Sequence, residues 1–285
     1  MTTIVSFPSH EARDEMNEKA DRHVLATDLD GTLIPLDDNR QNEADLKAVA
    51  SYLSMHHMLL TFVTGRHFES VSHARQQYGL PLPNWIICDV GTSIFERQPS
   101  GEFAAVEAYQ EHLGQLIASL PIRELESRLR FVDGLRIQEP EKQGRFKLSY
   151  YADASRLSEL VGATERELER DDAPYSIIHS VDPFTGDGLI DLLPAGVSKA
   201  YALAWWTEYV ELNPTAIIFA GDSGNDLAAL TAGYRAIVVG NADRSLARQV
   251  TQLHREQGWK DRLLLASNSA TSGVLEGLRW FQSSP

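Results

Sequence analysis

Residues 23–32 read HVLATDLDGT, and this stretch decides how the rest of the chain is interpreted. Its first six residues form an apolar run that suits a buried parallel strand. Asp28 and Asp30 stand two apart, and residues two apart on a strand project to the same side. Gly31 then lets the chain turn away. We therefore expect two carboxylates in one small space at the carboxyl end of a strand, where parallel sheets bind ligands.

Two neighbouring carboxylates repel each other unless a cation or a shared proton relieves the repulsion. Carboxylate oxygens suit Mg²⁺, which binds through a few carboxylates together with water and phosphate. The pattern D-x-D by itself also fits a solvated acidic turn, but the buried strand before it favours a site.

The stretch is the first unit of a repeating pattern of strands and helices. Such a pattern predicts an α/β fold, a parallel sheet with crossover helices. Further apolar, strand-like runs lie at residues 58–64, 85–89, 216–220 and 236–239, and helical spacing is found at 43–54, 68–78, 199–210 and 227–232.

The middle of the chain follows another pattern, in which one helix and two strands occur twice. We expect an α+β domain inserted into the α/β domain, and such insertions often cover a site at the strand ends. The expected elements are helices at 109–120 and 154–169 and strands at 135–138, 146–151, 175–180 and 188–192. The predicted domains are a polar, disordered leader at 1–22, a core at 23–94 and 194–285, and the insert at 95–193.

A second acidic motif, GDSGND at residues 221–226, directly follows the run AIIFA. Asp222 and Asp226 are four apart, so one turn of a beginning helix can aim both inward. The motif alone also fits a helix N-cap, with Asp226 satisfying backbone N–H groups. Two acidic strand ends in one parallel sheet favour a shared site.

Two further features complete the constellation. Thr64-Gly65 ends the second strand-like run, where a hydroxyl and free N–H groups can hold a phosphate oxygen, although Thr-Gly is also a common turn. Lys199 opens a predicted helix and could offset the charge of carboxylates and phosphate, although a lysine on a helix surface is the simpler alternative.

Together these residues suggest phosphoryl transfer. One aspartate of the first pair attacks phosphorus, and the other protonates the leaving alcohol and later activates water. Mg²⁺ and Lys199 would neutralise the charge on the phosphoryl oxygens. The spacing does not decide which aspartate has which role.

The four motifs resemble those of the haloacid dehalogenase superfamily in order and position. The resemblance implies a Rossmann-like core with a C2-type cap domain, Asp28 as the nucleophile and Asp30 as the general acid/base. It implies Mg²⁺ bound by the Asp28 side chain, the Asp30 carbonyl and Asp222, with Asp226 in support. The expected phosphoryl-binding residues are Thr64, Gly65, Lys199 and Asn225.

Within the superfamily the chain looks most like the sucrose-phosphate phosphatases, which include mannosylfructose-phosphate phosphatases. The likeness rests on ATDLDGTL, VGT, FKLSYY, DLLP, GDSGND and SGVLEGLRWF. It implies a disaccharide phosphate substrate such as sucrose 6-phosphate and a sugar-phosphate synthase acting upstream. Mannosylfructose, trehalose and hexose phosphates, and a non-catalytic sugar-phosphate sensor, are the alternatives.

Specificity is expected in the cap. Lys147 resembles a family lysine that faces the sugar. The alternative interpretation is that Lys147 is an exposed lysine on a strand. Residues 185–188 (TGDG) could contact sugar hydroxyls or form a plain turn.

Composition limits the other possibilities. The 285 residues carry a formal net charge of −14, which argues against a nucleic-acid binder. Cys88 is the single cysteine, so an intramolecular disulfide is impossible and a reducing cytoplasm fits. No apolar run is long enough to cross a membrane, and residues 1–23 lack a signal-peptide core.

Overall fold

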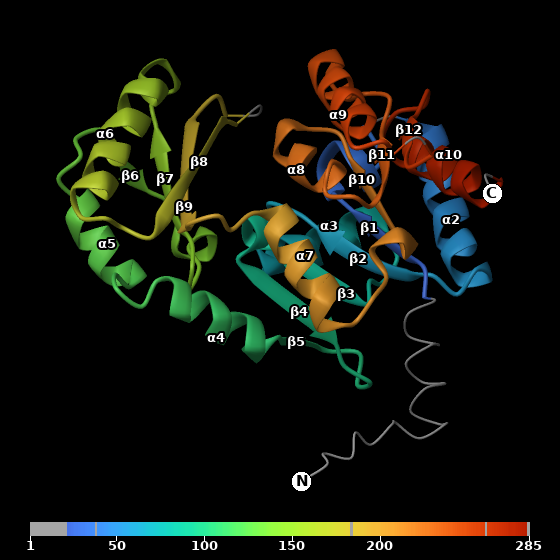
Figure 1. Ribbon diagram of the computed structural model, residues 1–285, viewed down its shortest axis with the longest axis horizontal. Coiled ribbons are helices and arrows are strands. Elements are labelled where there is room, and N and C mark those ends of the chain that lie inside the picture. The colour runs from blue at the N-terminus through green and yellow to red at the C-terminus, as the bar shows by residue number, and fades with distance from the viewer. Residues whose placement is uncertain (1–21, 38, 183–184, 260, 284–285) are drawn as a thin grey trace, which may run out of the picture. The chain divides into compact units, whose positions relative to one another are not determined.

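The computed structural model describes residues 22–37, 39–182, 185–259 and 261–283 (Figure 1). The polar leader predicted at 1–22 therefore lies outside the described residues, except for its last residue. The chain divides into two compact units. The first comprises the residues up to Phe62, Tyr78–Asn84 and those from Leu203 onward, and the second comprises Val63–Gln77 and Trp85–Ala202.

Five parallel strands form the centre of the first unit, in the order β12-β11-β10-β1-β2. The register sets Thr27 opposite Ala220 and Phe62, so β1 lies between β10 and β2. All four residues of β1 are buried, as expected for an interior parallel strand. The strands are β1 (Val24–Thr27), β2 (Leu59–Val63), β10 (Ile217–Gly221), β11 (Arg235–Val238) and β12 (Leu263–Leu265).

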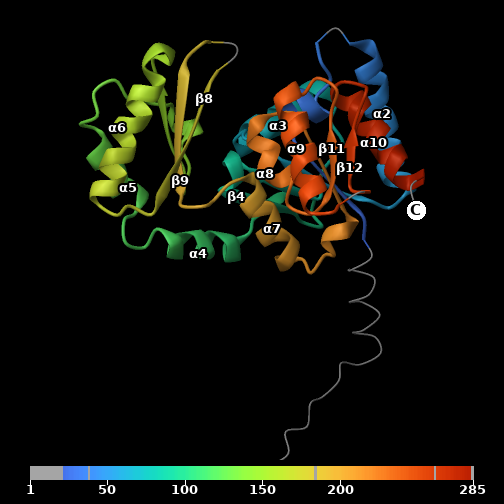
Figure 2. The ribbon, with the colours of Figure 1, turned by 45° about the horizontal axis from the view of Figure 1, so that its top comes forward.

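Helices pack against these strands through apolar faces. In α10, the helix nearest the C-terminus, nine residues are buried, and α10 lies beside α2 in both views (Figures 1 and 2). Leu246, Val250 and His254 form the buried stripe of α9, at a spacing of one helical turn. The helices are α2 (Arg40–Met55), α8 (Leu227–Leu230), α9 (Arg244–Glu256) and α10 (Ala270–Ser283).

The second unit contains an antiparallel strand set and a separate four-stranded sheet. Strands β3, β4 and β5 pair in sequence, and the four-stranded sheet has the order β6-β7-β9-β8 with all pairs antiparallel. The strands are β3 (Trp85–Cys88), β4 (Ser93–Arg97), β5 (Phe103–Ala105), β6 (Arg136–Ile137), β7 (Leu148–Ala152), β8 (Tyr175–Val181) and β9 (Gly188–Pro194).

Helices α5 and α6 cover one face of the four-stranded sheet (Figures 1 and 2). Leu148, Tyr150, Ile190 and Leu192 are buried on that face, whereas Ser149 and Asp191 point to the other. The helices that lie in this unit or begin in it are α3 (Phe68–Tyr78), α4 (Glu107–Leu116), α5 (Ile122–Leu129), α6 (Leu157–Arg170) and α7 (Lys199–Tyr209).

The predicted α/β class with an inserted α+β segment is confirmed. The predicted insert boundary at residue 95 falls inside β4, which pairs with β3. The pattern did not predict β4, β5, α5, α9, β12 or α10. Among the described residues, no helix is long and apolar enough to span a bilayer.

One stability prediction concerns the contact between α10 and β11. A Cβ atom at Gly277 would lie 2.3 Å from Cδ1 of fully buried Ile237, so Gly277→Ala should overpack the core and lower the free energy of unfolding by about 1–3 kcal/mol. The control is Gly162→Ala in α6, where the nearest atom, an Arg166 nitrogen, is 3.5 Å away. It should raise stability by about 0.5–1 kcal/mol. Urea denaturation of both variants measures this, and equal effects would refute the packing argument.

Candidate active site

The first unit gathers three of the predicted acidic residues at the carboxyl ends of adjacent strands. Asp28 directly follows β1 and donates its backbone N–H to the Ala220 carbonyl of β10 at 2.9 Å. Asp222 follows β10, and Asp226 lies one turn later. One carboxylate oxygen from each of Asp28, Asp222 and Asp226 lies within 4.8 Å of the others. The parallel register thus brings together residues almost two hundred positions apart.

These carboxylates are largely withdrawn from water. Asp28 is 4% exposed, Asp226 is fully buried, and Asp222 is half-buried. Buried like charges are unfavourable unless donors or a cation compensate them. Part of the compensation is local, because Asp226 Oδ2 accepts bonds from the Asp222 and Ser223 backbone N–H groups at 3.3 and 3.2 Å and from Ser223 Oγ at 3.1 Å.

The position of Asp226 therefore fits both interpretations of its motif, the helix N-cap and the shared acidic cluster. Asp226 forms a capping box with Ser223 at the start of the turn, and it also offers a ligand atom to the acidic cluster. The supporting role expected for Asp226 fits this geometry, since one of its oxygens already holds the loop that carries Asp222.

Two glycines allow the carboxylates to approach the backbone. A Cβ atom on Gly31, whose φ is +74°, would lie 2.4 Å from Asp222 Oδ2. A Cβ atom on Gly221 would lie 2.7 Å from the Asp226 Cβ. Neither position can carry a side chain without displacing a carboxylate, and this explains Gly31 in DLDGT and Gly221, the first glycine of GDSGND.

Thr32 and Asn241 also touch the acidic cluster, although neither was predicted as a site residue. Thr32 Oγ1 donates to Asp222 Oδ1 at 2.9 Å. Asn241 Nδ2 donates to the Gly31 carbonyl at 2.8 Å and lies 3.5 Å from Asp222 Oδ2. The Asn241 Oδ1 atom accepts the Ala270 N–H at 2.7 Å, which ties the loop after β11 to the start of α10. Asn241 follows a strand end in the same sheet, and that position was the available signal.

The other predicted residues of this unit lie at the surface. Asp30 is exposed and does not belong to the group of three close carboxylates. Asn225 is exposed as well, and its Oδ1 accepts a bond from Ser223 Oγ at 2.8 Å.

The chemistry of the cluster fits a hard divalent cation. The ligand atoms that these three side chains offer are all carboxylate oxygens. Gly31 and Gly221 place no side chain next to the carboxylates. Mg²⁺ binds through such oxygens and keeps several waters for other partners. Asp28, Asp222 and Asp226 are the residues whose side chains would hold it, and the Asp30 carbonyl stays a predicted ligand.

In the second unit, Thr64 and Lys199 are both buried. The Thr64 backbone N–H donates to the Ile87 carbonyl at 2.9 Å, and its Oγ1 accepts the Arg66 N–H at 3.2 Å. Gly65 beside it is exposed. Lys199 begins α7 and is 1% exposed, so the interpretation of Lys199 as a helix-surface lysine is wrong.

Lys147 is also withdrawn from solvent. It precedes β7, is 5% exposed and places its Nζ atom 2.8 Å from Asp89 Oδ1. The alternative of an exposed strand lysine is therefore wrong. Asp89 was not predicted as a site residue, because in the sequence it reads only as the end of a strand.

In the segment TGDG at 185–188, the first three residues precede β9 and Gly188 is the first residue of that strand. Gly186 has a φ of +76°, and its N–H donates to the Asp182 carbonyl at 2.9 Å. Arg136 reaches the Asp187 carboxylate at 3.3 Å. The segment is thus a hairpin connection with an exposed polar surface.

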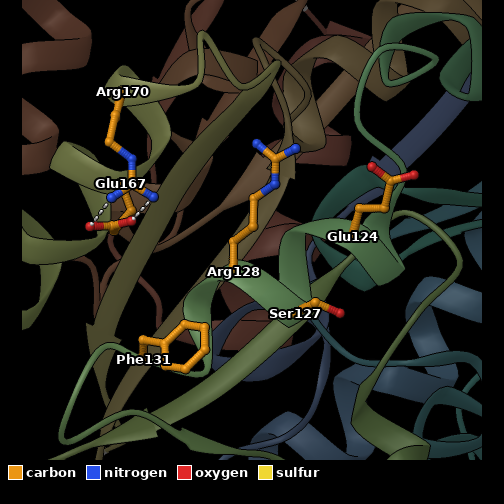
Figure 3. Close-up of a pocket in the computed structure, with 6 residues that line it drawn as sticks. All are labelled: Glu124, Ser127, Arg128, Phe131, Glu167 and Arg170. Atoms are coloured by element: carbon orange, nitrogen blue, oxygen red, sulfur yellow. Dashed lines mark hydrogen bonds and ion pairs between the residues drawn. The ribbon is translucent and has the colours of Figure 1, made fainter.

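A hollow on the outer side of α5 and α6 contains none of the predicted residues (Figure 3). Arg170 there pairs with Glu167 at 2.7 Å, and Arg128 pairs with Asp171 at 2.6 Å. Phe131 beside them is 77% exposed. These arginines have carboxylate partners already, so the hollow does not resemble a phosphate site.

Comparison with known proteins identifies the family. The family model for sucrose-6F-phosphate phosphohydrolase matches residues 21–282. The chain belongs to this family. It is therefore a phosphatase, a hydrolase of phosphoric monoesters, with the haloacid dehalogenase fold and a cap domain, as the motifs predicted.

Individual relatives agree with this assignment. The chain is 32% identical to a putative HAD-like hydrolase of Nitrosococcus oceani, over 90% of this chain and 71% of the relative. It is 29% identical to a mannosylfructose-phosphate phosphatase of Agrobacterium fabrum, over 92% and 98%. The solved sucrose-phosphatase of Synechocystis, in complex with sucrose and phosphate, superposes with a TM-score of 0.69 at 24% identity, over 92% and 98% of the two chains.

The contacts of Asn241 lead to a prediction. Asn241→Ala removes the donor to Gly31 and the acceptor for Ala270, so Asp222 should lose its fixed position. We expect phosphatase activity to fall about tenfold, the effect of losing a group that orients a metal ligand. The control is Asn213→Ala, which removes a turn cap after α7. Steady-state assays at several Mg²⁺ concentrations test this, and an Asn241→Ala enzyme as active as the control would exclude the role.

Proposed function

We propose that the protein hydrolyses a sugar phosphate, with a disaccharide phosphate such as sucrose 6-phosphate as the expected substrate. The observation that carries the proposal is the buried carboxylate of Asp28 at the end of β1, in one cluster with Asp222 and Asp226. A carboxylate in this place is available as a nucleophile if its neighbours are neutralised by a cation.

The proposed reaction has two displacements at phosphorus. An Asp28 oxygen forms a bond to phosphorus while the bond to the sugar oxygen breaks, and Asp30 gives its proton to that oxygen. Asp30 then takes a proton from water, which attacks phosphorus and breaks the bond to Asp28, so that inorganic phosphate leaves. The exposed position of Asp30 suits a group that must exchange protons with water.

Other residues would bind the phosphoryl oxygens. We assign this role to Thr64, Gly65, Lys199 and Asn225, of which Thr64 and Lys199 are buried and so keep a fixed geometry. When bound, Mg²⁺ supplies positive charge that offsets the phosphoryl oxygens. Lys147, on the cap segment before β7, would contact the sugar.

A second substrate has support from one comparison. Mannosylfructose phosphate fits the relative that matches over nearly its whole length. A panel of sucrose, mannosylfructose, trehalose and hexose phosphates, assayed for phosphate release with Mg²⁺, separates these substrates. A narrow response to one disaccharide phosphate supports the proposal, and no release from any of them would favour the sensor alternative.

The proposal also implies a context. A phosphorylated disaccharide must be supplied by a synthase that joins a sugar to a sugar phosphate, so such an enzyme acts upstream. Cys88 is a buried, free cysteine, which suits a reducing compartment. The cytoplasm remains our prediction.

The nucleophile assignment predicts the effect of Asp28→Asn. An amide cannot form the phosphoenzyme, so turnover should fall at least about 10³-fold, as for other removed nucleophiles. Far-ultraviolet circular dichroism should remain that of the wild type, since the side chain is nearly isosteric. A variant that retains a tenth of the activity would show that another residue attacks phosphorus.

The metal assignment predicts that EDTA removes activity and that added Mg²⁺ restores it. Ca²⁺ should substitute poorly, because it prefers more ligands at longer distances and would displace the phosphate relative to Asp28. Asp222→Asn should raise the Mg²⁺ concentration needed for half-maximal activity. Full activity after exhaustive chelation would contradict the assignment.

A further inference from the structure

Residues Asp89, Val90 and Gly91 form a turn, hereafter the 89–91 turn, with three successive left-handed conformations. Their φ angles are +52°, +59° and +98°. This conformation is uncommon for any residue with a side chain and rarest for a β-branched one such as Val90. Asp89 and Val90 are also buried, at 7% and 8% exposure. An unusual backbone in a buried place persists only when its surroundings hold it.

Several bonds hold the 89–91 turn. The Asp89 N–H donates to the Arg66 carbonyl at 2.8 Å, and Thr92 Oγ1 donates to the Asp89 carbonyl at 2.9 Å. Tyr109, on α4, donates its hydroxyl to the Gly91 carbonyl at 2.6 Å. The turn is therefore fixed at both ends, and the direction of the Asp89 side chain is fixed with it.

The Asp89 carboxylate faces Lys147. The two side chains are 10% and 6% exposed, and their charged atoms are 2.8 Å apart. Removing two charges from water is costly, and well-packed apolar residues in place of such a pair are often as stable or more stable. Stability alone is therefore a poor explanation for this pair.

A second carboxylate lies close to the same lysine. Asp191 on β9 stands opposite Ser149 on β7, and Ser149 Oγ donates to Asp191 Oδ1 at 2.5 Å. Lys147 directly precedes β7, two residues before Ser149, and its charge acts on the Asp191 carboxylate. Burial raises the pKa of Asp191 and the Lys147 charge lowers it. Carboxylates, a hydroxyl and an ammonium together match the donors and acceptors of a polyol.

The other end of the 89–91 turn touches the start of α7. A Cβ atom on Gly91 would lie 2.3 Å from the Ser198 carbonyl oxygen and 2.9 Å from the Lys199 backbone nitrogen. One rigid turn therefore contacts Lys147 through the Asp89 carboxylate and abuts Lys199 through the Gly91 backbone.

We propose that Asp89 is a positioning residue, whose carboxylate holds the Lys147 ammonium where it contacts the non-reacting, polyol part of the substrate. This inference rests on the proposed function. It adds Asp89 as a residue that determines substrate specificity. Asp89 itself transfers no proton and makes no bond to phosphorus. Its effect is on substrate selection, because the ammonium loses its direction when the carboxylate is removed.

The test compares two substrates in steady state: the best sugar phosphate of the panel, and p-nitrophenyl phosphate, which has no polyol part. Asp89→Asn suits the left-handed backbone, because asparagine tolerates it well. Lys147→Met and the double variant complete a mutant cycle. The control is Asp171→Asn, which breaks the surface ion pair with Arg128 in the same unit.

We expect Asp89→Asn to raise KM for the sugar phosphate about tenfold or more, the loss of one charged hydrogen bond. The loss in kcat/KM should be at least about tenfold larger for the sugar phosphate than for p-nitrophenyl phosphate. The double variant should resemble Lys147→Met, because Asp89 acts through Lys147. Asp171→Asn should keep the substrate ratio of the wild type.

Equal losses on both substrates would show that Asp89 serves the fold, and additive losses in the double variant would show that it acts apart from Lys147. Either result overturns the inference and leaves the proposed function intact. If Asp89→Asn does not fold, Asp89→Glu replaces it, because it keeps the charge but shifts its position. The same comparison of kcat/KM for the sugar phosphate and p-nitrophenyl phosphate then tests the inference. A wild-type enzyme that hydrolyses no sugar phosphate would overturn the proposed function, and the inference with it.

Discussion

The mutual repulsion of Asp28, Asp222 and Asp226 is the constraint on which the rest of the site depends. At about 5 Å, a pair of like charges near a protein surface costs roughly 3–4 kcal/mol. The fold brings the three carboxylates this close because β1 and β10 are neighbours in a parallel sheet. Backbone N–H groups, Thr32 and Ser223 offset part of the cost, and we propose that a divalent cation offsets the remainder. The repulsion that remains between these carboxylates is thus the source of the proposed affinity for Mg²⁺.

The second unit contains two buried lysines. Lys147 and Lys199 are both almost inaccessible, and the 89–91 turn contacts each of them, through the Asp89 carboxylate and the Gly91 backbone. A buried ammonium has a restricted set of positions, so it can recognise a ligand with little loss of side-chain entropy. On our proposal, the unfavourable backbone of the turn is the condition for directing the Lys147 ammonium, and the same turn abuts the start of α7.

Much of this could be predicted from the sequence, for reasons visible in single elements. The buried strands β1, β2, β3, β10 and β11 are short apolar runs in which glycine or aspartate is the last residue or follows within two residues, and the sequence predicts each to within one or two residues. Strand β5 has three residues, too few to show an alternation of apolar and polar side chains. The buried stripe of α9 does have a helical spacing in the sequence, although no helix is predicted there. The acidic motifs were found because each directly follows a strand. The bond from Asn241 to Gly31 and the pairing of Asp89 with Lys147 join distant segments, which no local pattern encodes, and the only local signal for Asn241 is its place after a strand end.

The most direct test of the account is to trap the phosphoenzyme. Enzyme that is turning over its best sugar phosphate with Mg²⁺ would be quenched in acid, digested and examined by mass spectrometry, since acyl phosphates survive acid far better than base. The proposed mechanism predicts one peptide that gains the mass of a phosphoryl group, with the modification on Asp28, and no such peptide from the Asp28→Asn variant. A phosphoryl group on a different residue would rule out Asp28 as the nucleophile, and so would rapid turnover without any modified peptide at quench times shorter than one catalytic cycle.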